Sequence, residues 1–341
     1  MDGSQGSNRA RSGVRQITAD TDVEAVRLWL AEYADSPKTV RSYRKEAVRL
    51  LIWATCVLGK PLSSLTREDL LAYEACLANP SIEWADPSLP RRGGGRRLFE
   101  GPLSPCSVRQ AQGILSGLFG YLVAAGYLAG NPLTLRRRRG CAKVSRRATV
   151  ERYLNRELWQ SVLDFIEALP QGKRRECQYY ERVHWLFRLL YGASLRVSEA
   201  AHAKTGDISQ RRGKWWLRVF GKGGEAGDVH LSDELMADWM RYRRFHGLLT
   251  IPTNLEKSIL IMSVTGRTNR FLTSTAIYIV VKEIFRRAVV AIEAPHPSGA
   301  ATLRRASTHW LRHTSATHQI DDGNDIRFIQ KNLRHEKTTG K

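Results

Sequence analysis

Apolar residues recur at helical spacing through the first third of the chain. This spacing predicts helices over residues 22–33, 37–54, 66–77 and 107–125. Ser36 and Pro37 are typical of a helix start, because serine caps free amides and proline fits the first turn. Residues 1–18 are polar and basic and are expected to form a disordered tail. We therefore expect a helical domain over residues 19–133.

Two segments interrupt this helical pattern. Residues 80–102 hold four prolines and the run Arg91-Arg92-Gly-Gly-Gly-Arg96-Arg97, which predicts a loop insertion. Residues 110–135 carry no charge and precede four arginines, so they formally resemble a membrane span. Five glycines and polar residues such as Gln110 and Asn131 interrupt the stretch, which favours a buried amphipathic helix followed by a turn. We expect no membrane segment.

The second half of the chain mixes two periodicities. Helical spacing recurs over 155–169, 181–191, 233–246, 275–292, 304–320 and 324–333. Residues 214–220 are rich in strand formers, and a glycine-rich turn leads to a short return strand over 228–231. We predict a mainly α protein, with a small antiparallel β-sheet in a C-terminal domain over 150–341.

The net charge indicates the partner. The 341 residues contain 54 Lys and Arg against 33 Asp and Glu, a formal charge of +21 that a polyanion would offset. Nucleic acid is the favoured partner, ahead of an anionic membrane surface or a small acidic substrate. Residues 134–149 form a basic linker that is either simply solvated or also follows phosphates. The candidate DNA contacts are Lys38, Arg41, Arg44, Arg136, Arg137, Arg138 and Arg139.

Cysteine usage and metal-ligand spacing exclude several classes. The five cysteines are scattered and form no C-x-x-C pair, so neither a disulfide framework nor a zinc finger is supported. The N-terminus lacks the apolar stretch of a signal peptide, and we expect an intracellular protein. His309 and His313 have zinc-like spacing, but Trp310 stands where a zinc protease has glutamate. We expect no metal and no cofactor.

Four separate positions carry residues suited to phosphate chemistry. His309 and Arg312 are three residues apart on a predicted helix and share a face, where a guanidinium and an imidazole can hold a phosphodiester. Alternatively, Arg312 is a surface cation and His309 a core histidine. Arg196 follows a Gly/Ser turn at a helix start, a position that attracts anions. Lys222 lies in the hairpin turn, and His335 follows the last predicted helix.

Together these pieces resemble the tyrosine recombinase (phage integrase) family. The matching segments are Ala193-Ser-Leu-Arg196-Val-Ser-Glu199, Gly221-Lys222-Gly223, His309-x-x-Arg312-His313 and Leu333-x-His335, in the family's order. Segments near Thr39–Tyr43, Ser107–Phe119 and Gly126–Pro132 resemble its N-terminal core-binding, SAM-like domain. The resemblance covers residues 20–341, and residues 80–102 look like an insertion within it.

The resemblance implies a metal-free transesterification on double-stranded DNA. In the family pattern, Arg196 and Arg312 clamp the scissile phosphate, and His309 and His335 hold its oxygens. Lys222 protonates the leaving 5′-oxygen, and Glu199 supports Arg196. A tyrosine attacks phosphorus and forms a 3′-phosphotyrosyl link. The resemblance also implies a tetramer on DNA and a place in the bacterial cytoplasm with the nucleoid.

The sequence departs from the family at the nucleophile. The family tyrosine lies a few residues beyond the histidine matched by His335, and this sequence stops six residues after it, at Lys341. Tyr191 and Tyr278 lie in apolar runs and are expected in the core. We interpret the chain as truncated before its nucleophile, which leaves open whether it is an enzyme. As written, it is expected to bind DNA without cutting it.

Three other interpretations stay open at this stage. The chain is a non-catalytic remnant or regulator that occupies recombination sites. It is a generic nucleic-acid or membrane binder, in which Arg196 matters no more than any surface arginine. It is a type IB topoisomerase, which uses nearly the same residues; the N-terminal segments favour the recombinase.

Overall fold

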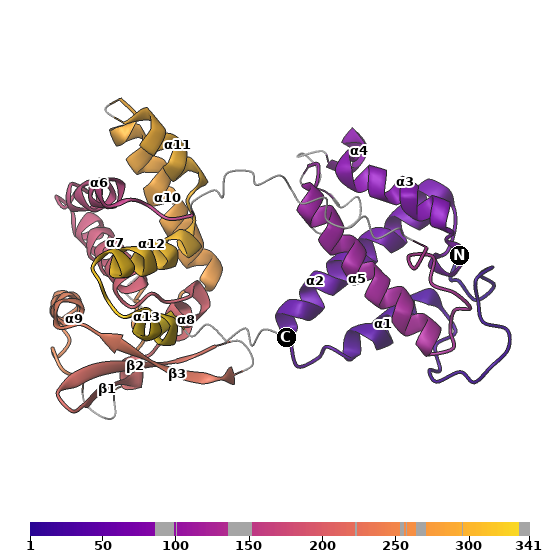
Figure 1. Cartoon of the computed structure of the whole chain (residues 1–341), viewed down its shortest axis with the longest axis horizontal. Coiled ribbons are helices and arrows are strands. Elements are labelled where there is room, and N and C mark those ends of the chain that lie inside the picture. Colours follow the sequence, from indigo (N-terminus) through magenta and orange to yellow (C-terminus); the bar gives the residue numbers. More distant parts are fainter. Residues whose placement is uncertain are drawn as a thin grey trace. The chain divides into compact units, whose positions relative to one another are not determined.

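The structure, a computed structural model, describes residues 1–85, 99, 101–135, 152–221, 224–252, 256, 258–263, 271–294 and 296–333. The chain divides into two compact units, Met1–Ser145 and Arg146–Lys341. The division falls inside residues 134–149, the segment expected to be a linker. Each unit is mainly helical around its own apolar core, and the C-terminal unit adds a small antiparallel sheet (Figure 1). The predicted fold class is therefore confirmed.

The N-terminal unit is a helical bundle whose helices begin at capping residues. Thr21 and Thr66 each accept the backbone N–H three residues later, and the acidic side chains there bond back to the cap. Helix α5 packs against the three other long helices (Figure 1). The helices are α1 (Asp22–Ala31), α2 (Pro37–Trp53), α3 (Arg67–Ala78), the one-turn α4 (Ile82–Ala85) and α5 (Pro105–Ala124).

The first eighteen residues pack on this bundle, which corrects the expectation of a disordered tail. The Asn8 side chain bonds both the N–H and the C=O of Gly130, and its backbone N–H donates to Ser63. The Arg9 guanidinium lies 3.7 Å from the centre of the Tyr127 ring. The contacts with Gly130 and Tyr127 join residues more than a hundred positions apart, so no local pattern in a polar segment signals them.

The structure describes part of the expected loop insertion 80–102. Besides α4, it contains Phe99, which is buried and donates its backbone N–H to Trp84. The guanidinium of Arg49 lies 4.8 Å from the centre of the Phe99 ring. Residues 86–98 and 100, which include the glycine-rich run, lie outside the described residues.

Helix α7 is the central element of the C-terminal unit. It contacts α6, α8, α9 and α12, and α10 packs against α6, α8, α11 and α12 (Figure 1). The helices are α6 (Arg156–Glu167), α7 (Arg174–Gly192), α8 (Val197–His202), α9 (Asp233–Phe245), α10 (Ser274–Ile292), α11 (Pro297–Arg305), α12 (Thr308–Asp321) and α13 (Ile326–Leu333).

The helix expected over 304–320 is two helices. Helix α11 ends at Arg305, and Ala306 adopts an extended conformation before α12 begins at Thr308. Ala306 is fully buried, and its carbonyl accepts a hydrogen bond from the Lys282 ammonium at 2.9 Å. This break starts α12 just before His309.

The sheet has three antiparallel strands in the order β1 (Ile208–Arg211), β2 (Lys214–Phe220) and β3 (Ala226–Leu231). Leu217, Val219, Val229 and Leu231 are buried, so one face of the hairpin joins the core. The sequence predicted β2 and β3 but not β1, whose four residues include a single apolar side chain.

In the part of the chain that the structure describes, no helix is long and apolar enough to cross a membrane.

Candidate active site and nucleic-acid interface

A tight turn after α7 presents Arg196. The turn runs through Ser194, whose backbone is left-handed with φ of 47° and whose amide donates to Tyr191. The Ser194 hydroxyl lies 2.6 Å from that of Ser315 on α12, so the turn is tied to a second helix. Arg196 then caps α8 and keeps 38% of its side chain exposed.

Glu199 joins the two arginines that the sequence singled out. Its carboxylate is fully buried and accepts both the backbone N–H of Arg196, at 2.7 Å, and its guanidinium, at 2.9 Å. Oε2, the oxygen that accepts the backbone N–H, also lies 3.8 Å from Arg312 Nη1. Two guanidiniums 116 positions apart in sequence therefore meet at one carboxylate.

Arg312 is more enclosed than a phosphate-gripping side chain was expected to be. It lies on α12 with only 3% of its side chain exposed. Its guanidinium donates to the carbonyl of Ser194 at 2.8 Å and to the carbonyl of Leu333 at the end of α13. Arg312 is thus neither a surface cation nor, in this conformation, an open partner for a large ligand.

His309 forms the exposed edge of the same cluster. It lies one helical turn before Arg312, and its ring packs edge-to-face on His313 with centroids 4.5 Å apart. Partial desolvation lowers the pKa of His309, and nearby His313, Arg312 and Arg196 lower it further. The imidazole is therefore neutral near pH 7, when it can donate one proton and accept another.

Lys222, His335 and Arg136–Arg139 lie outside the described residues. The strands on either side of the Lys222 turn, β2 and β3, are paired as expected. In the described part of the chain, no group of three His, Cys, Asp or Glu residues is placed to hold a metal ion.

Neither tyrosine considered as a substitute nucleophile behaves as a simple core residue. Tyr278 is 45% exposed, which corrects the expectation that it is buried. Tyr191 is half-buried, and its hydroxyl lies 2.9 Å from Nδ1 of His318. The other nitrogen of His318 lies 3.0 Å from the carbonyl of Leu154, whose amide donates to Thr314.

This Tyr191–His318–Leu154 connection was missed by sequence reasoning. It ties the residues that enter the C-terminal unit to α12, the helix that carries His309 and Arg312. The one available signal was a third histidine in the same helix, and a histidine there is equally typical of a surface position. Burial of His318 lowers its pKa, and Arg156 lowers it further.

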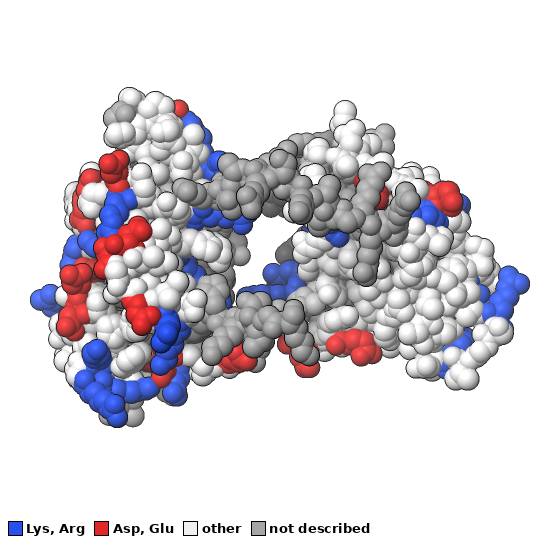
Figure 2. Space-filling view, viewed as in Figure 1, with Lys and Arg blue, Asp and Glu red and all other residues white. Residues whose placement is uncertain are grey.

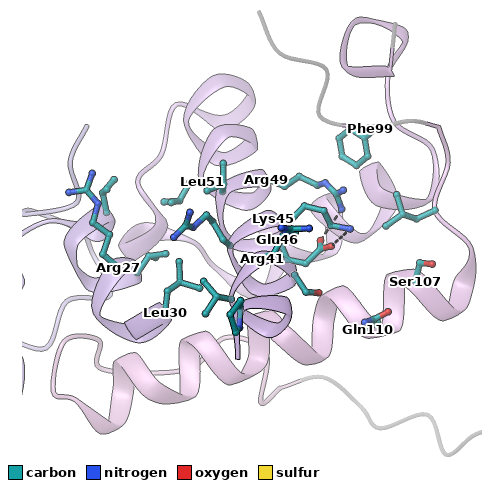
Figure 3. A pocket seen from close by; sticks show the side chains of 18 of the residues that line it. Arg27, Leu30, Arg41, Lys45, Glu46, Arg49, Leu51, Phe99, Ser107 and Gln110 are labelled. Carbon is teal, nitrogen blue, oxygen red and sulfur yellow. Dashed lines mark hydrogen bonds and ion pairs between the residues drawn. The ribbon is translucent and has the colours of Figure 1, made fainter. Parts of the chain in front are cut away.

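The N-terminal unit contains a basic groove of about 1850 Å³ between α1, α2 and the start of α5 (Figure 3). Glu46 and Arg49 form a buried ion pair of 2.8 Å in its wall, and Lys45 contacts the other Glu46 oxygen at 3.0 Å. Arg49 is buried, whereas Arg41, Arg44 and Lys45 of the same helix are exposed. The basic residues that line the groove are Arg27, Arg41, Arg44, Lys45 and Arg49.

The groove contains two of the three predicted DNA contacts on α2. Arg41 and Arg44 line it, whereas Lys38 is exposed on the first turn of the helix and is not among the lining residues. Figure 2 shows that Lys and Arg also gather over the end of the C-terminal unit that carries β1 and β2, with acidic residues between them.

Comparison with known proteins identifies the family. Residues 153–339, more than half of the chain, match the model of the phage integrase family, and the chain belongs to that family. Tyrosine recombinase XerC of Pelobacter propionicus is 32% identical over 175 residues, which cover 51% of this chain and 50% of that protein. XerC of Chlorobaculum parvum is 26% identical over 313 residues, covering 89% of this chain and 83% of that protein.

Solved structures share the fold of both units. The XerH site-specific recombinase bound to difH substrate superposes with a TM-score of 0.59 at 16% identity, covering 94% of this chain and 78% of that one. A lambda integrase dimer bound to a COC′ core site gives a TM-score of 0.58 at 15% identity, covering 93% and 75%.

Proposed function

We propose that this member of the phage integrase family acts on double-stranded DNA as a site-specific recombinase. The observation that carries the proposal is the meeting of Arg196 and Arg312 at the buried Glu199 carboxylate, with the exposed His309 imidazole one turn away. One buried carboxylate leaves an excess of positive charge at the exposed edge, which suits a phosphodiester.

In the proposed reaction a tyrosine hydroxyl gives its proton to the neutral His309 imidazole as its oxygen attacks phosphorus, and the bond from phosphorus to the 5′-oxygen breaks. Lys222 gives a proton to the departing 5′-oxygen, and the 3′-phosphate stays on the tyrosine. Arg196 and Arg312 offset the negative charge that builds on the phosphate oxygens. His309 and His335 hydrogen-bond those oxygens. A 5′-hydroxyl then reverses the step and rejoins the strand, so no other energy source is consumed.

The enclosure of Arg312 refines these roles. Because Arg196 and His309 are exposed and Arg312 is covered, the phosphate first contacts Arg196 and His309. Arg312 reaches the phosphate when its bond to the Leu333 carbonyl is released. Until then it acts through Glu199 and the Ser194 carbonyl, which hold the Arg196 turn in place.

The N-terminal groove is proposed to follow the DNA backbone. Arg41 and Lys45 on α2 and Arg27 on α1 line it (Figure 3). Arg44 on α2 is also a lining residue. Lys38 and the linker arginines Arg136–Arg139 are further proposed contacts. XerH and lambda integrase, which share this fold, were solved on DNA, lambda integrase as a dimer and as a tetramer. We propose the same partner, and a tetramer on DNA, for this chain.

The second candidate function is DNA binding without strand cleavage. It is favoured by one observation on the structure: Arg312 keeps only 3% of its side chain exposed and donates to the carbonyls of Ser194 and Leu333, so it does not face a phosphate in this conformation. Such a chain would occupy recombination sites, as a regulator does, in the bacterial cytoplasm with the nucleoid.

A nicked suicide duplex separates binding from cleavage. We expect the 341-residue polypeptide to shift the duplex on a native gel, since the groove and Arg196 contact phosphates. On a denaturing gel the recombinase predicts a covalent protein–DNA adduct, whereas DNA binding without cleavage predicts none. An adduct would show that one of the eleven tyrosines acts as nucleophile and would overturn the binding-only function. Absence of the native shift would overturn both candidates.

A further inference from the structure

A second, smaller pocket lies in the C-terminal unit and plays no part in the proposed function. It encloses about 430 Å³ between the α6–α7 connection, the N-terminal half of α7 and α10. Arg196 follows the opposite end of α7, a 19-residue helix. The pocket is therefore separate from the candidate active site. The lining residues that matter here are Leu169, Lys173, Arg175, Tyr179, Arg182 and Arg287.

Arg182 is the unusual member of this set. Its Nε is buried and has no hydrogen-bond partner. Its guanidinium lies 5.6 Å from the centre of the Tyr179 ring, and no carboxylate among the described residues forms an ion pair with it. Burial of the guanidinium lowers the pKa of Arg182. Arg182 is only partly buried, but a cation partly withdrawn from water without a counter-ion costs free energy, and a bound anion would recover part of it.

The one acid in the pocket wall does not supply that counter-ion. The Glu176 carboxylate accepts the backbone N–H of Lys173 at 3.0 Å and so caps the start of α7. The wall thus combines four basic side chains with a single, already engaged carboxylate. Apolar surface from Leu169 and Pro170 lies beside them.

We propose that this pocket binds a small organic phosphate, with the phosphate on Arg182 and the apolar body of the ligand against Leu169 and Pro170. A guanidinium group donates two parallel hydrogen bonds to phosphate oxygens. Four basic side chains also offset the two charges of a phosphate dianion, whereas a carboxylate ligand would bring only one. The volume is that of a small-ligand site and too small to admit a duplex. The proposal does not depend on the recombinase function.

The test is calorimetric titration of the 341-residue protein with three probes: phenyl phosphate, inorganic phosphate and phenol. We expect phenyl phosphate to bind most tightly, because only that probe supplies both charge and apolar body. In Arg182→Gln the affinity should fall at least about tenfold. The matched control is Arg174→Gln, which removes an exposed arginine from the same helix but outside the pocket lining, and its affinity should stay within about twofold.

Folding of the variant can be checked independently. Because Arg182 lacks a partner, Arg182→Gln should unfold at the same temperature as the wild type or a higher one when no ligand is present. Equal affinity of Arg182→Gln and wild type for phenyl phosphate would overturn the proposal. So would tighter binding of a hexaglutamate peptide through Arg182, which would assign the pocket to an acidic protein segment. A loss of duplex binding in Arg182→Gln would assign it to DNA and would equally overturn it.

Discussion

At the scale of single residues, Glu199 determines the geometry of the site. Its buried carboxylate contacts two guanidiniums and so holds them near each other. The family resemblance implied a supporting role for Glu199 beside Arg196, three residues away. It did not predict the contact with Arg312, because that contact depends on how α8 and α12 pack.

Replacing Glu199 with glutamine should therefore destabilise the C-terminal unit. The change leaves the buried Arg312 without its carboxylate, which costs about 3 kcal/mol of unfolding free energy, at the lower end for buried pairs because Arg196 is partly exposed. Urea denaturation measures the loss. Glu283→Gln removes an exposed carboxylate paired with Arg286 and should unfold like the wild type. Equal stability of the two variants would show that the Glu199 carboxylate does not contribute to the free energy of unfolding.

Arg312 marks the limit of sequence reasoning at this scale. The i, i+3 spacing put His309 and Arg312 one turn apart on a helix, and α12 contains both. The family pattern put Arg312 with Arg196 at one site, and both guanidiniums contact Glu199. The burial of Arg312 comes from the Ser194 and Leu333 carbonyls, which approach from two other elements. No spacing within α12 signals such contacts.

At the scale of elements, the best predictions were helices with both a cap and an apolar face. The second helix begins at Pro37 as expected, and α6 begins after the cap Asn155. Elements specified by tertiary contacts were missed: β1 pairs with β2 despite its polar sequence, and the first eighteen residues pack through side-chain bonds to distant backbone.

The N-terminal segment gives a prediction at this scale. Asn8→Ala removes two hydrogen bonds to Gly130 and should lower the stability of the N-terminal unit by about 1–2 kcal/mol. Thermal denaturation or urea titration measures the change. Ser12→Ala alters an exposed residue of the same segment and is expected to be neutral. If residues 1–18 did not pack on the bundle, neither substitution would change the free energy of unfolding.

At the scale of the whole molecule, several histidines share one electrostatic property. Burial lowers the pKa of His184 and His318, and partial desolvation lowers that of His309. In each case the unfolded chain takes up a proton at a higher pH than the folded chain does. The unfolded state then binds more protons, so stability rises with pH in this range.

We therefore expect the free energy of unfolding to fall as pH decreases below about 6.5, the ordinary histidine value. The carboxyl groups with lowered pKa, such as Asp228 and Glu256, lose their stabilisation only below about pH 4.5. Urea titrations between about pH 7.5 and pH 5 measure the slope of the unfolding free energy against pH. His318→Gln should reduce it, whereas an unchanged slope would mean that His318 does not contribute.

The whole chain also carries the charge that a DNA partner would offset, yet a net charge of +21 alone does not distinguish a specific site from general attraction. The distinction rests on Arg196. If Arg196 contacts a phosphate at a specific site, its removal changes the number of counter-ions released when DNA binds. If the chain binds DNA only through its overall charge, any exposed arginine has the same effect.

The salt dependence of duplex affinity, measured by fluorescence anisotropy, tests this directly in wild type, Arg196→Ala and Arg286→Ala. Arg286 is exposed on α10 and paired with Glu283. For Arg196→Ala the slope of log K against log salt should become shallower by about 0.9, the loss of one phosphate contact. Arg286→Ala should keep the wild-type slope. Identical slopes for both variants would contradict a phosphate site at Arg196.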